Sequence, residues 1–271
     1  MLSPRLSRDD PSATSPRAWP VPYADAPRDL DAALSLTRRG PWVLRGVFDD
    51  ATLARLRASA LLDAHPDAVP VAPVCEGRVV IDPRRGLGTA PRRLDDLIHS
   101  LATGTNDGYV AATRDELPAA LAAAVASPAF TLGAPWRVGR LWVGGAGTVS
   151  ALHRDLSHNA HTVIEGRKRF WIASTAHDRD LYPARPWSSV PNGSRVDPER
   201  VDLARFPHAA RVRPWVAELG PGETLLLPSR WWHHVRTLDL SVSVNTFFAT
   251  GSLARVVAAA NAAKSLRGLN R

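Results

Sequence analysis

Between Trp136 and Phe248 the chain is a series of short apolar runs broken by Gly, Pro and Asn. Runs of this length with turn-forming residues between them are typical of strands in a β-sandwich or barrel, because helices need longer amphipathic segments. We therefore expect a mostly β fold in this part of the chain. The expected strands are Arg137–Val143, Ala160–Ile164, Arg169–Ala173, Glu223–Leu227 and Ser241–Phe248.

The segments on either side of these runs favour helices. Apolar spacing and capping residues predict helices over 28–38, from Asp50 to Leu62, and over 94–101, 117–126 and 253–266, with Gly268 placed to end the last one. Strands are expected over 41–47 and within 69–80, a basic loop over 83–94, and a long loop over 174–215 that passes over the barrel. The chain then divides into a tail (1–22), an α/β flanking region (23–130), a barrel core (131–250) and a C-terminal helix (251–271).

The composition is that of a globular protein, with 45% hydrophobic residues. No apolar run approaches the roughly 18 residues that a membrane span needs, so no membrane partner is expected. The first residues are rich in Ser, Pro, Arg and Asp without an apolar segment, which favours a disordered tail over a signal peptide. Cys75 is the single cysteine, so no internal disulfide can form, and we expect a cytoplasmic location.

The formal net charge is +8, which admits a nucleic-acid partner without indicating one. The arginines occur in scattered pairs with acidic residues nearby, and this favours a solvated Arg-rich surface. Only Lys168 and Lys264 among the 34 basic residues are lysines. Lys168 lies within the segment that carries the chemical motifs and therefore calls for a specific explanation.

The main chemical pattern is a His-x-Asp pair with a second imidazole source further along the chain. His153 and Asp155 are two residues apart, so on an extended strand their side chains share a face, about 7 Å apart along the chain. The run Trp231-Trp232-His233-His234 follows an expected strand and offers a further ligand. Two imidazoles and one carboxylate are the ligand set of non-haem iron(II) oxygenases, which leaves positions open for a bidentate 2-oxo acid and O2.

Each half of this pattern also has an ordinary explanation. His-x-Asp pairs are common on surfaces, and Trp-Trp-His-His is compatible with an aromatic core and a capped histidine. Their occurrence together, in this order and on β-type segments, favours a metal centre.

The segment 162–172 predicts a hairpin with its turn at Glu165–Arg167. Past the turn, alternation places Lys168, Phe170 and Ile172 on one, mostly apolar face. A buried ammonium needs an anion, and the distal carboxylate of 2-oxoglutarate is a fitting partner. The alternative is a lysine whose charged end reaches the surface at a strand end.

These residues together resemble the jumonji-C-related cupins, in particular hydroxylases of the type called factor inhibiting HIF. The family pattern has a His-x-Asp, then an Asn and a Gly-x-Lys, and later a Gly-Asp-x-x-x-x-Pro-x-x-Trp-Trp-His-His motif before a Val-Asn strand. Here the likeness covers about 100 residues. Glu223 stands where the family has Asp, at a position that is not a ligand. The matching segments are His153-Arg-Asp155, Asn159, Gly166-Arg-Lys168, Gly222–His234 and Val244-Asn245.

The resemblance implies a double-stranded β-helix and an iron(II) centre that uses 2-oxoglutarate and O2. It selects His233 over His234 as the third metal ligand. It also implies five residues around 2-oxoglutarate: Lys168 for the distal carboxylate, Ser150 in place of a family Thr, the upstream Tyr109, and the polar Asn159 and Asn245.

The strand that contains Asn245 has a polar and an apolar face. Ser241, Ser243 and Asn245 alternate with apolar residues, so this polar row faces either the barrel interior, as we expect, or solvent. Two tryptophans next to the motifs, Trp142 and Trp232, are candidates for a substrate-side wall or for the core.

The expected function is hydroxylation of an unactivated C–H bond, on a protein or peptide side chain. Alternatives are a small-molecule hydroxylase, an N-demethylase, an RNA-modifying oxygenase, and a metal-binding cupin without enzymatic activity. The apolar side of the helix over 253–266 either docks on its own barrel or pairs with a second copy, and relatives favour a homodimer.

Overall fold

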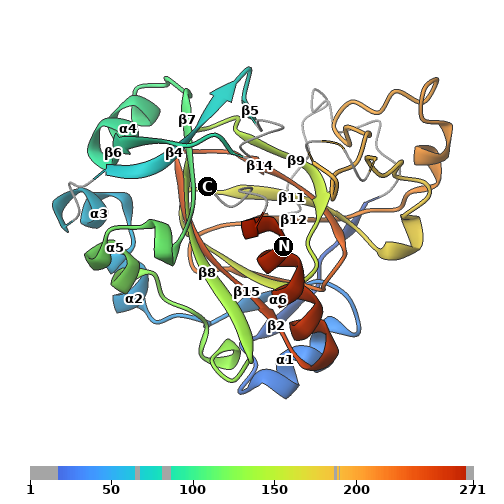
Figure 1. The fold of residues 1–271 in the computed structure, drawn as a ribbon, viewed down its shortest axis with the longest axis horizontal. Coiled ribbons are helices and arrows are strands. Elements are labelled where there is room, and N and C mark those ends of the chain that lie inside the picture. Colours follow the sequence, from blue (N-terminus) through green and yellow to red (C-terminus); the bar gives the residue numbers. More distant parts are fainter. Residues whose placement is uncertain (1–17, 65–67, 81–86, 186–187, 189, 267–271) are drawn as a thin grey trace, which may run out of the picture.

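The computed structural model describes residues 18–64, 68–80, 87–185, 188 and 190–266. Strands dominate, and two sheets wrap around a common interior as a barrel with helices on its outside (Figure 1). The strands are β1 (Trp19–Pro20), β2 (Tyr23–Asp25), β3 (Trp42–Arg45), β4 (Ala68–Cys75), β5 (Arg78–Val79), β6 (Ala90–Arg93), β7 (Gly108–Thr113), β8 (Trp136–Gly144), β9 (Val149–Arg154), β10 (His158–Glu165), β11 (Lys168–Ala173), β12 (Trp215–Leu219), β13 (Thr224–Leu227), β14 (Trp232–Thr237) and β15 (Ser241–Ala249).

One sheet has the order β1-β12-β11-β14-β9-β5, and the other β4-β7-β8-β15-β10-β13-β3-β2, with β4 also pairing β5 and β6. A single apolar cluster combines Val163 and Leu225 of the second sheet with Phe170, Leu219 and Val235 of the first. The inner faces of the two sheets therefore pack on each other. This arrangement confirms the expected mostly β fold and is that of a double-stranded β-helix.

The link between β10 and β11 differs from the predicted hairpin. β10 pairs with β13 and β15, whereas β11 pairs with β12 and β14, so the chain crosses from one sheet to the other at Gly166. The hairpin prediction was wrong because a turn signal marks a change of direction and leaves the pairing partners open. The predicted alternation holds, since Lys168 is fully buried while Arg169 is half-buried.

The helices are α1 (Leu30–Thr37), α2 (Asp50–Arg55), α3 (Ala58–Ala64), α4 (Leu94–Ala102), α5 (Ala119–Ala124) and α6 (Gly251–Leu266). Helices α2 to α5 gather on one side of the barrel (Figure 1).

The cap of α2 is Asp49, whose carboxylate accepts from the Thr52 amide at 2.7 Å, rather than the expected Asp50. The predicted helix to Leu62 is interrupted at Leu56, and the Ala58 amide at the start of α3 donates to Glu165 at 2.7 Å.

Two expected boundaries shift in the structure. Strand β1 pairs with β12 and the adjacent Val21 is buried, so the ordered domain begins before the predicted limit of the tail at residue 22. The remainder of that tail, residues 1–17, and Gly268 lie outside the described residues. In the expected basic loop, Ala90–Arg93 form strand β6, and residues 81–86 are outside the described part.

The described residues of the segment 174–214 cover the outer face of the sheet that contains β9 and β14 (Figure 1). It contains short 3-10 helices at Thr175–His177 and Pro207–Arg211. Its buried side chains pack on Leu152, Ala173 and Trp232, so this expected long loop has a core of its own. Those side chains are Leu181, Val196, Phe206, Ala209 and Val212.

Helix α6 docks on its own barrel. Ala254 and Val257 pack with Ala249 and Trp136, whereas Val256 is 54% exposed. Pairing with a second copy therefore stays a prediction.

Within the described ranges no helix combines the length and apolar character of a membrane span.

The crossing at Gly166 generates the first prediction. Gly166 has φ +72°, and an added Cβ would lie 2.1 Å from the Leu240 carbonyl oxygen. We expect Gly166→Ala to lower the free energy of unfolding by about 1–2 kcal/mol through the left-handed conformation and by roughly 1–3 kcal/mol more through the clash. Denaturant unfolding measures both.

Gly46→Ala is the matched control, because Gly46 has φ +71° and nothing within 4 Å of an added Cβ. Gly46→Ala should lower the free energy of unfolding only by the about 1–2 kcal/mol that the left-handed conformation costs. Equal losses in the two variants would show that the Leu240 carbonyl does not constrain the crossing.

Candidate metal centre

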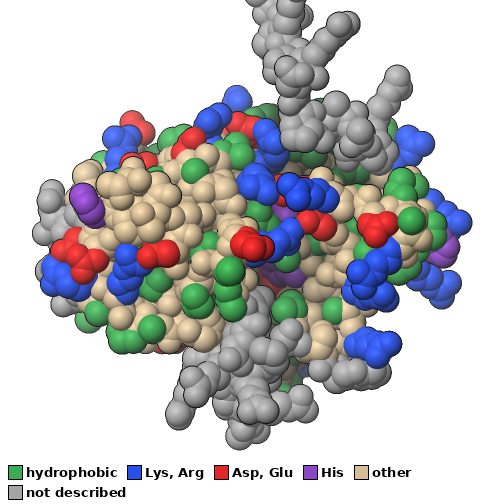
Figure 2. Space-filling model, turned by 90° about the horizontal axis from the view of Figure 1, so that it is seen from above, with side chains coloured by type: hydrophobic (Ala, Val, Ile, Leu, Met, Phe, Trp, Pro, Cys, Tyr) green, Lys and Arg blue, Asp and Glu red, His purple; other side chains and the backbone are tan. Residues whose placement is uncertain are grey.

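His153, Asp155 and His233 converge at the ends of β9 and β14. Their ligand atoms all lie within 4.8 Å of one another. The Asp155 Oδ2 atom is 4.0 Å from His153 Nε2 and 3.5 Å from His233 Nε2. His233 is buried, whereas the side chains of His153 and Asp155 are each 25% exposed, so the centre opens to solvent on one side. Figure 2 shows histidine side chains in a hollow between basic and acidic side chains.

The register of β9 on β14 produces this convergence. His153 lies opposite His233, and Ser150 lies opposite Val235, so a bulge places an extra residue on β9 between the two pairs. Directly opposed residues point to the same side of a sheet. The bulge therefore brings Ser150 and His153 to the interior together, although strict alternation would separate them.

Backbone carbonyls orient both imidazoles. His153 Nδ1 lies 2.7 Å from the Ala151 carbonyl oxygen, and His233 Nδ1 lies 3.2 Å from that of Trp231. Donation from Nδ1 leaves Nε2 free as the ligand atom, which is the usual way in which a protein selects the metal-binding tautomer. Burial lowers the pKa of His233 to about 4, and the neighbouring His153 adds to the effect, so this imidazole is neutral at neutral pH.

His234 lies on the opposite face of β14. Its Nε2 atom is 3.3 Å from Glu199 Oε1, an oxygen that also accepts from Arg236 Nε at 2.6 Å. Arg236 and His234 hold the pKa of Glu199 well below its usual range, against the opposing effect of burial. The geometry thus brings His233, and not His234, to the other two candidate ligands.

Lys168 lies fully buried in the same barrel interior. Its Nζ donates to Tyr109 Oη at 3.4 Å, and among the described residues no carboxylate forms an ion pair with it. A buried cation without an anion is costly, so this end of the interior fits a bound carboxylate. The structure brings Tyr109 to Lys168, as the short sequence match suggested.

Further polar atoms around Lys168 lack partners. Burial lowers the pKa of His161 well below its usual value, with the positive charge of Lys168 adding to the effect, so the ring is neutral. Its Nε2 atom and the hydroxyls of Ser241 and Ser243 are buried without a hydrogen bond among the described residues. The polar row on β15 therefore faces the interior, and its unpaired groups fit a polar co-substrate.

The two asparagines and Trp142 form a connected network. Asn245 Nδ2 donates to Asn159 Oδ1 at 2.8 Å, and Trp142 Nε1 donates to Asn245 Oδ1 at 2.9 Å. The Trp142 ring lies 5.9 Å from that of Tyr109 and 6.2 Å from that of His161. Trp142 thus belongs to the interior that contains the candidate site.

Trp232 is not brought to the centre. It alternates with His233 on β14 and points to the outer face, where its Nε1 donates to Asp178 at 2.7 Å and Arg154 covers its ring at 4.7 Å. As a substrate-side wall it was a wrong prediction, because adjacent residues of a strand face opposite sides.

Sequence reasoning also missed two interior residues, His161 and Arg140, although each lies two positions from a predicted one.

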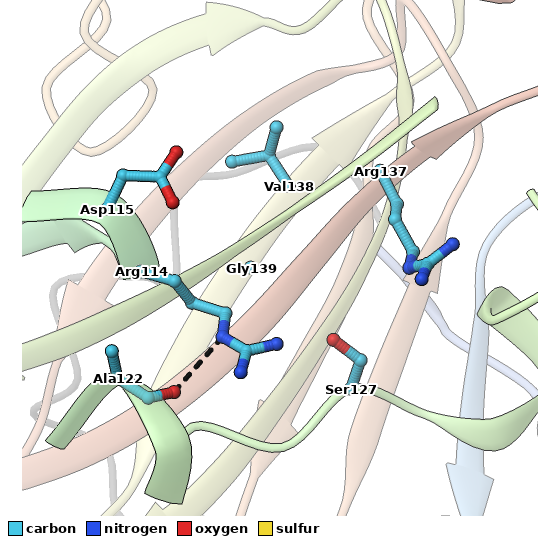
Figure 3. Close-up of a pocket in the computed structure, with 7 residues that line it drawn as sticks. All are labelled: Arg114, Asp115, Ala122, Ser127, Arg137, Val138 and Gly139. Carbon is cyan, nitrogen blue, oxygen red and sulfur yellow. Dashed lines mark hydrogen bonds between the residues drawn. The ribbon is translucent and has the colours of Figure 1, made fainter. Parts of the chain in front are cut away.

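A separate pocket of about 350 Å³ lies on the outer side of β8 (Figure 3). Arg114 and Arg137 extend into it, and Arg114 Nε donates to the Ala122 carbonyl at 3.0 Å. None of the candidate metal ligands lines this pocket. This pocket is therefore separate from the candidate metal centre.

Comparison with known proteins agrees with this geometry. The model of the cupin-like domain family matches residues 93–253, more than half of the chain, and the chain belongs to this family of jumonji-C/cupin-like oxygenases. Members of the family use iron(II) and 2-oxoglutarate, and the donor set found here fits both.

Several curated proteins match the same region. Lysine-specific demethylase 8 of Xenopus tropicalis is 41% identical over 108 residues, which is 40% of this chain and 24% of that protein. Jumonji C domain-containing protein 5 of Drosophila melanogaster is 37% identical over 106 residues, 39% of this chain and 26% of that protein. HSPB1-associated protein 1 of Rattus norvegicus is 35% identical over 122 residues, 42% of this chain and 25% of that protein. The chain thus spans about a quarter of the length of these relatives.

The metal centre generates the second prediction. His233→Ala should weaken anaerobic iron(II) binding by more than about 100-fold, since even residues that only orient ligands contribute roughly 10–100-fold. Isothermal titration calorimetry measures the affinity.

His234→Gln is the neighbouring control and should keep the wild-type affinity for iron(II), because His234 faces Glu199 on the other side of β14. Comparable losses in both variants would contradict the assignment of His233.

Proposed function

We propose that this chain is an iron(II)- and 2-oxoglutarate-dependent oxygenase that hydroxylates an unactivated C–H bond. The observation that carries the proposal is the buried Lys168, which has no carboxylate partner among the described residues and shares one barrel interior with the His153, Asp155 and His233 cluster. A metal-binding cupin without this co-substrate has no need of an unneutralised buried cation.

His153, Asp155 and His233 would hold the iron, and the family's co-substrate would lie between that centre and Lys168. Iron(II) with 2-oxoglutarate supplies the oxidation of a C–H bond by O2, with succinate and carbon dioxide as co-products. The protein supplies position and a dry interior. Lys168 and Tyr109 bind the distal carboxylate, and the Asn159–Asn245–Trp142 network fixes the wall beside it.

The substrate proposed is a protein or peptide side chain. Three of the matching relatives are named as lysine-specific demethylases. Hydroxylation of an N-methyl carbon leads to loss of that carbon, so hydroxylation and demethylation are outcomes of one proposed reaction on different substrates.

The first test is anaerobic addition of iron(II) and 2-oxoglutarate, followed by oxygen and measurement of succinate, beside a His153→Ala variant. We expect a visible charge-transfer absorption before oxygen, and succinate that depends on iron, 2-oxoglutarate and His153. Absence of both signals in the wild-type protein would refute the proposal.

The third prediction concerns Lys168. Lys168→Met should raise the Kd for 2-oxoglutarate by more than roughly 100-fold, because removal of one partner from a buried ion pair costs about 3–5 kcal/mol. Without 2-oxoglutarate the unfolding temperature should not fall, since the substitution removes a buried charge that has no carboxylate partner. Thermal melts with and without 2-oxoglutarate measure both effects.

Arg169→Met is the control, because Arg169 is the next residue of β11, is only half-buried and pairs with Glu218 at 3.3 Å. It should leave 2-oxoglutarate affinity unchanged. A Lys168→Met protein that unfolds earlier yet binds 2-oxoglutarate normally would give Lys168 a structural role only.

A further inference from the structure

Arg140 occupies the interior face of β8, on the metal side of the barrel. Its Cα is opposite Asn245 of β15 and Thr113 of β7. It shares this face of β8 with Trp142, which donates to Asn245, and with Gly144, which lies opposite Tyr109. Inward residues of one strand repeat at about 7 Å, so Arg140 lies two such steps from the Tyr109 and Lys168 end of the interior.

The surroundings of Arg140 are aromatic and largely shielded from water. Its guanidinium carbon lies 5.9 Å from the Trp142 ring centroid and 5.7 Å from that of Phe247, the next inward residue after Asn245 on β15. Burial lowers the pKa of Arg140, an effect that the charges of Glu116 and Asp155 partly offset. The guanidinium is nevertheless charged at all ordinary pH values.

This guanidinium has no acceptor of its own. Nε of Arg140 is buried without a partner, and within the described part of the chain no residue accepts a hydrogen bond from it or forms an ion pair with it. Of the two acids whose charges reach it, Glu116 accepts hydrogen bonds from Thr113 and Asp155 is a candidate metal ligand. A largely shielded cation, whose buried Nε has no partner among the described residues, therefore lies on the metal side of the barrel interior.

We propose that Arg140 is a specificity-determining residue that binds a carboxylate of the substrate, which rests on the proposed oxygenase function. A planar guanidinium presents parallel N–H donors that match the two oxygens of a carboxylate, and flanking rings hold its plane and exclude water. The carboxylate belongs either to a free amino acid or to an Asp or Glu side chain of a peptide. Lys168 takes the co-substrate carboxylate at one end, and Arg140 takes that of the substrate near the metal.

The test uses matched pairs of compounds with the iron-loaded full chain. One arm compares free L-amino acids with their carboxamides, and the other compares peptides that contain Asp or Glu with their Asn or Gln counterparts. Succinate release above the level without added compound is the signal. Only the carboxylate members should stimulate it, and the arm that responds identifies the source of the carboxylate.

For the stimulating compound, Arg140→Gln should raise KM by roughly 100-fold, the size of effect expected when one partner of a desolvated charge pair is lost. Arg140→Lys should recover part of this loss, because it restores the charge without the planar fork. The apparent Kd for 2-oxoglutarate should change far less than KM. Arg137→Gln is the matched control on the same strand, since Arg137 points to the outer pocket (Figure 3).

Equal stimulation by amides and acids, or a wild-type KM in Arg140→Gln, would overturn the assignment. So would the failure of every carboxylate compound to stimulate succinate release by a protein that shows the anaerobic absorption of bound iron and 2-oxoglutarate. Loss of that absorption in the wild-type protein would instead remove the oxygenase proposal, and the role of Arg140 with it.

Discussion

The antiparallel pairing of β9 with β14 is the constraint on which the candidate site depends. It sets His153 opposite His233, and its bulge turns Ser150 to the same side. A shift of one residue in this register would send both imidazoles to opposite faces and leave no cluster of ligands. The pairing is in turn held by β11 on the other edge of β14. The candidate metal centre therefore forms only if β9 and β14 pair in this register, whatever metal the three side chains could bind.

Two interior cations mark the ends of the space that this pairing creates, Lys168 fully buried and Arg140 partly exposed. Lys168 and Arg140 both lie inside the barrel without a carboxylate partner among the described residues, and each is accompanied by aromatic rings. A fold gains nothing from such charges unless anions bind there, because desolvation costs more than packing returns. The unpaired charges of Lys168 and Arg140 lower the stability of the fold, and this cost fits a site that binds one carboxylate from the co-substrate and one from the substrate.

The sequence was sufficient to predict that His153, Asp155 and His233 converge and that Lys168 is buried, because both follow from motifs and from two-residue alternation. The sequence did not predict features that depend on which strands pair with each other. The turn at Gly166 reads equally as a hairpin or as a crossing between sheets, and only the distant strands β13 and β14 distinguish them. Arg140 escaped notice because its chemistry arises from aromatic neighbours on another strand, which no local pattern contains.

Strand β14 divides its residues between two environments. His233 faces the metal centre, while the adjacent Trp232 is anchored to Asp178 beneath the segment 174–214. The residue anchored to Asp178 and the candidate ligand are therefore separated along β14 by a single peptide bond. The position of a candidate iron ligand inside the barrel thus depends on packing that the segment 174–214 provides outside it.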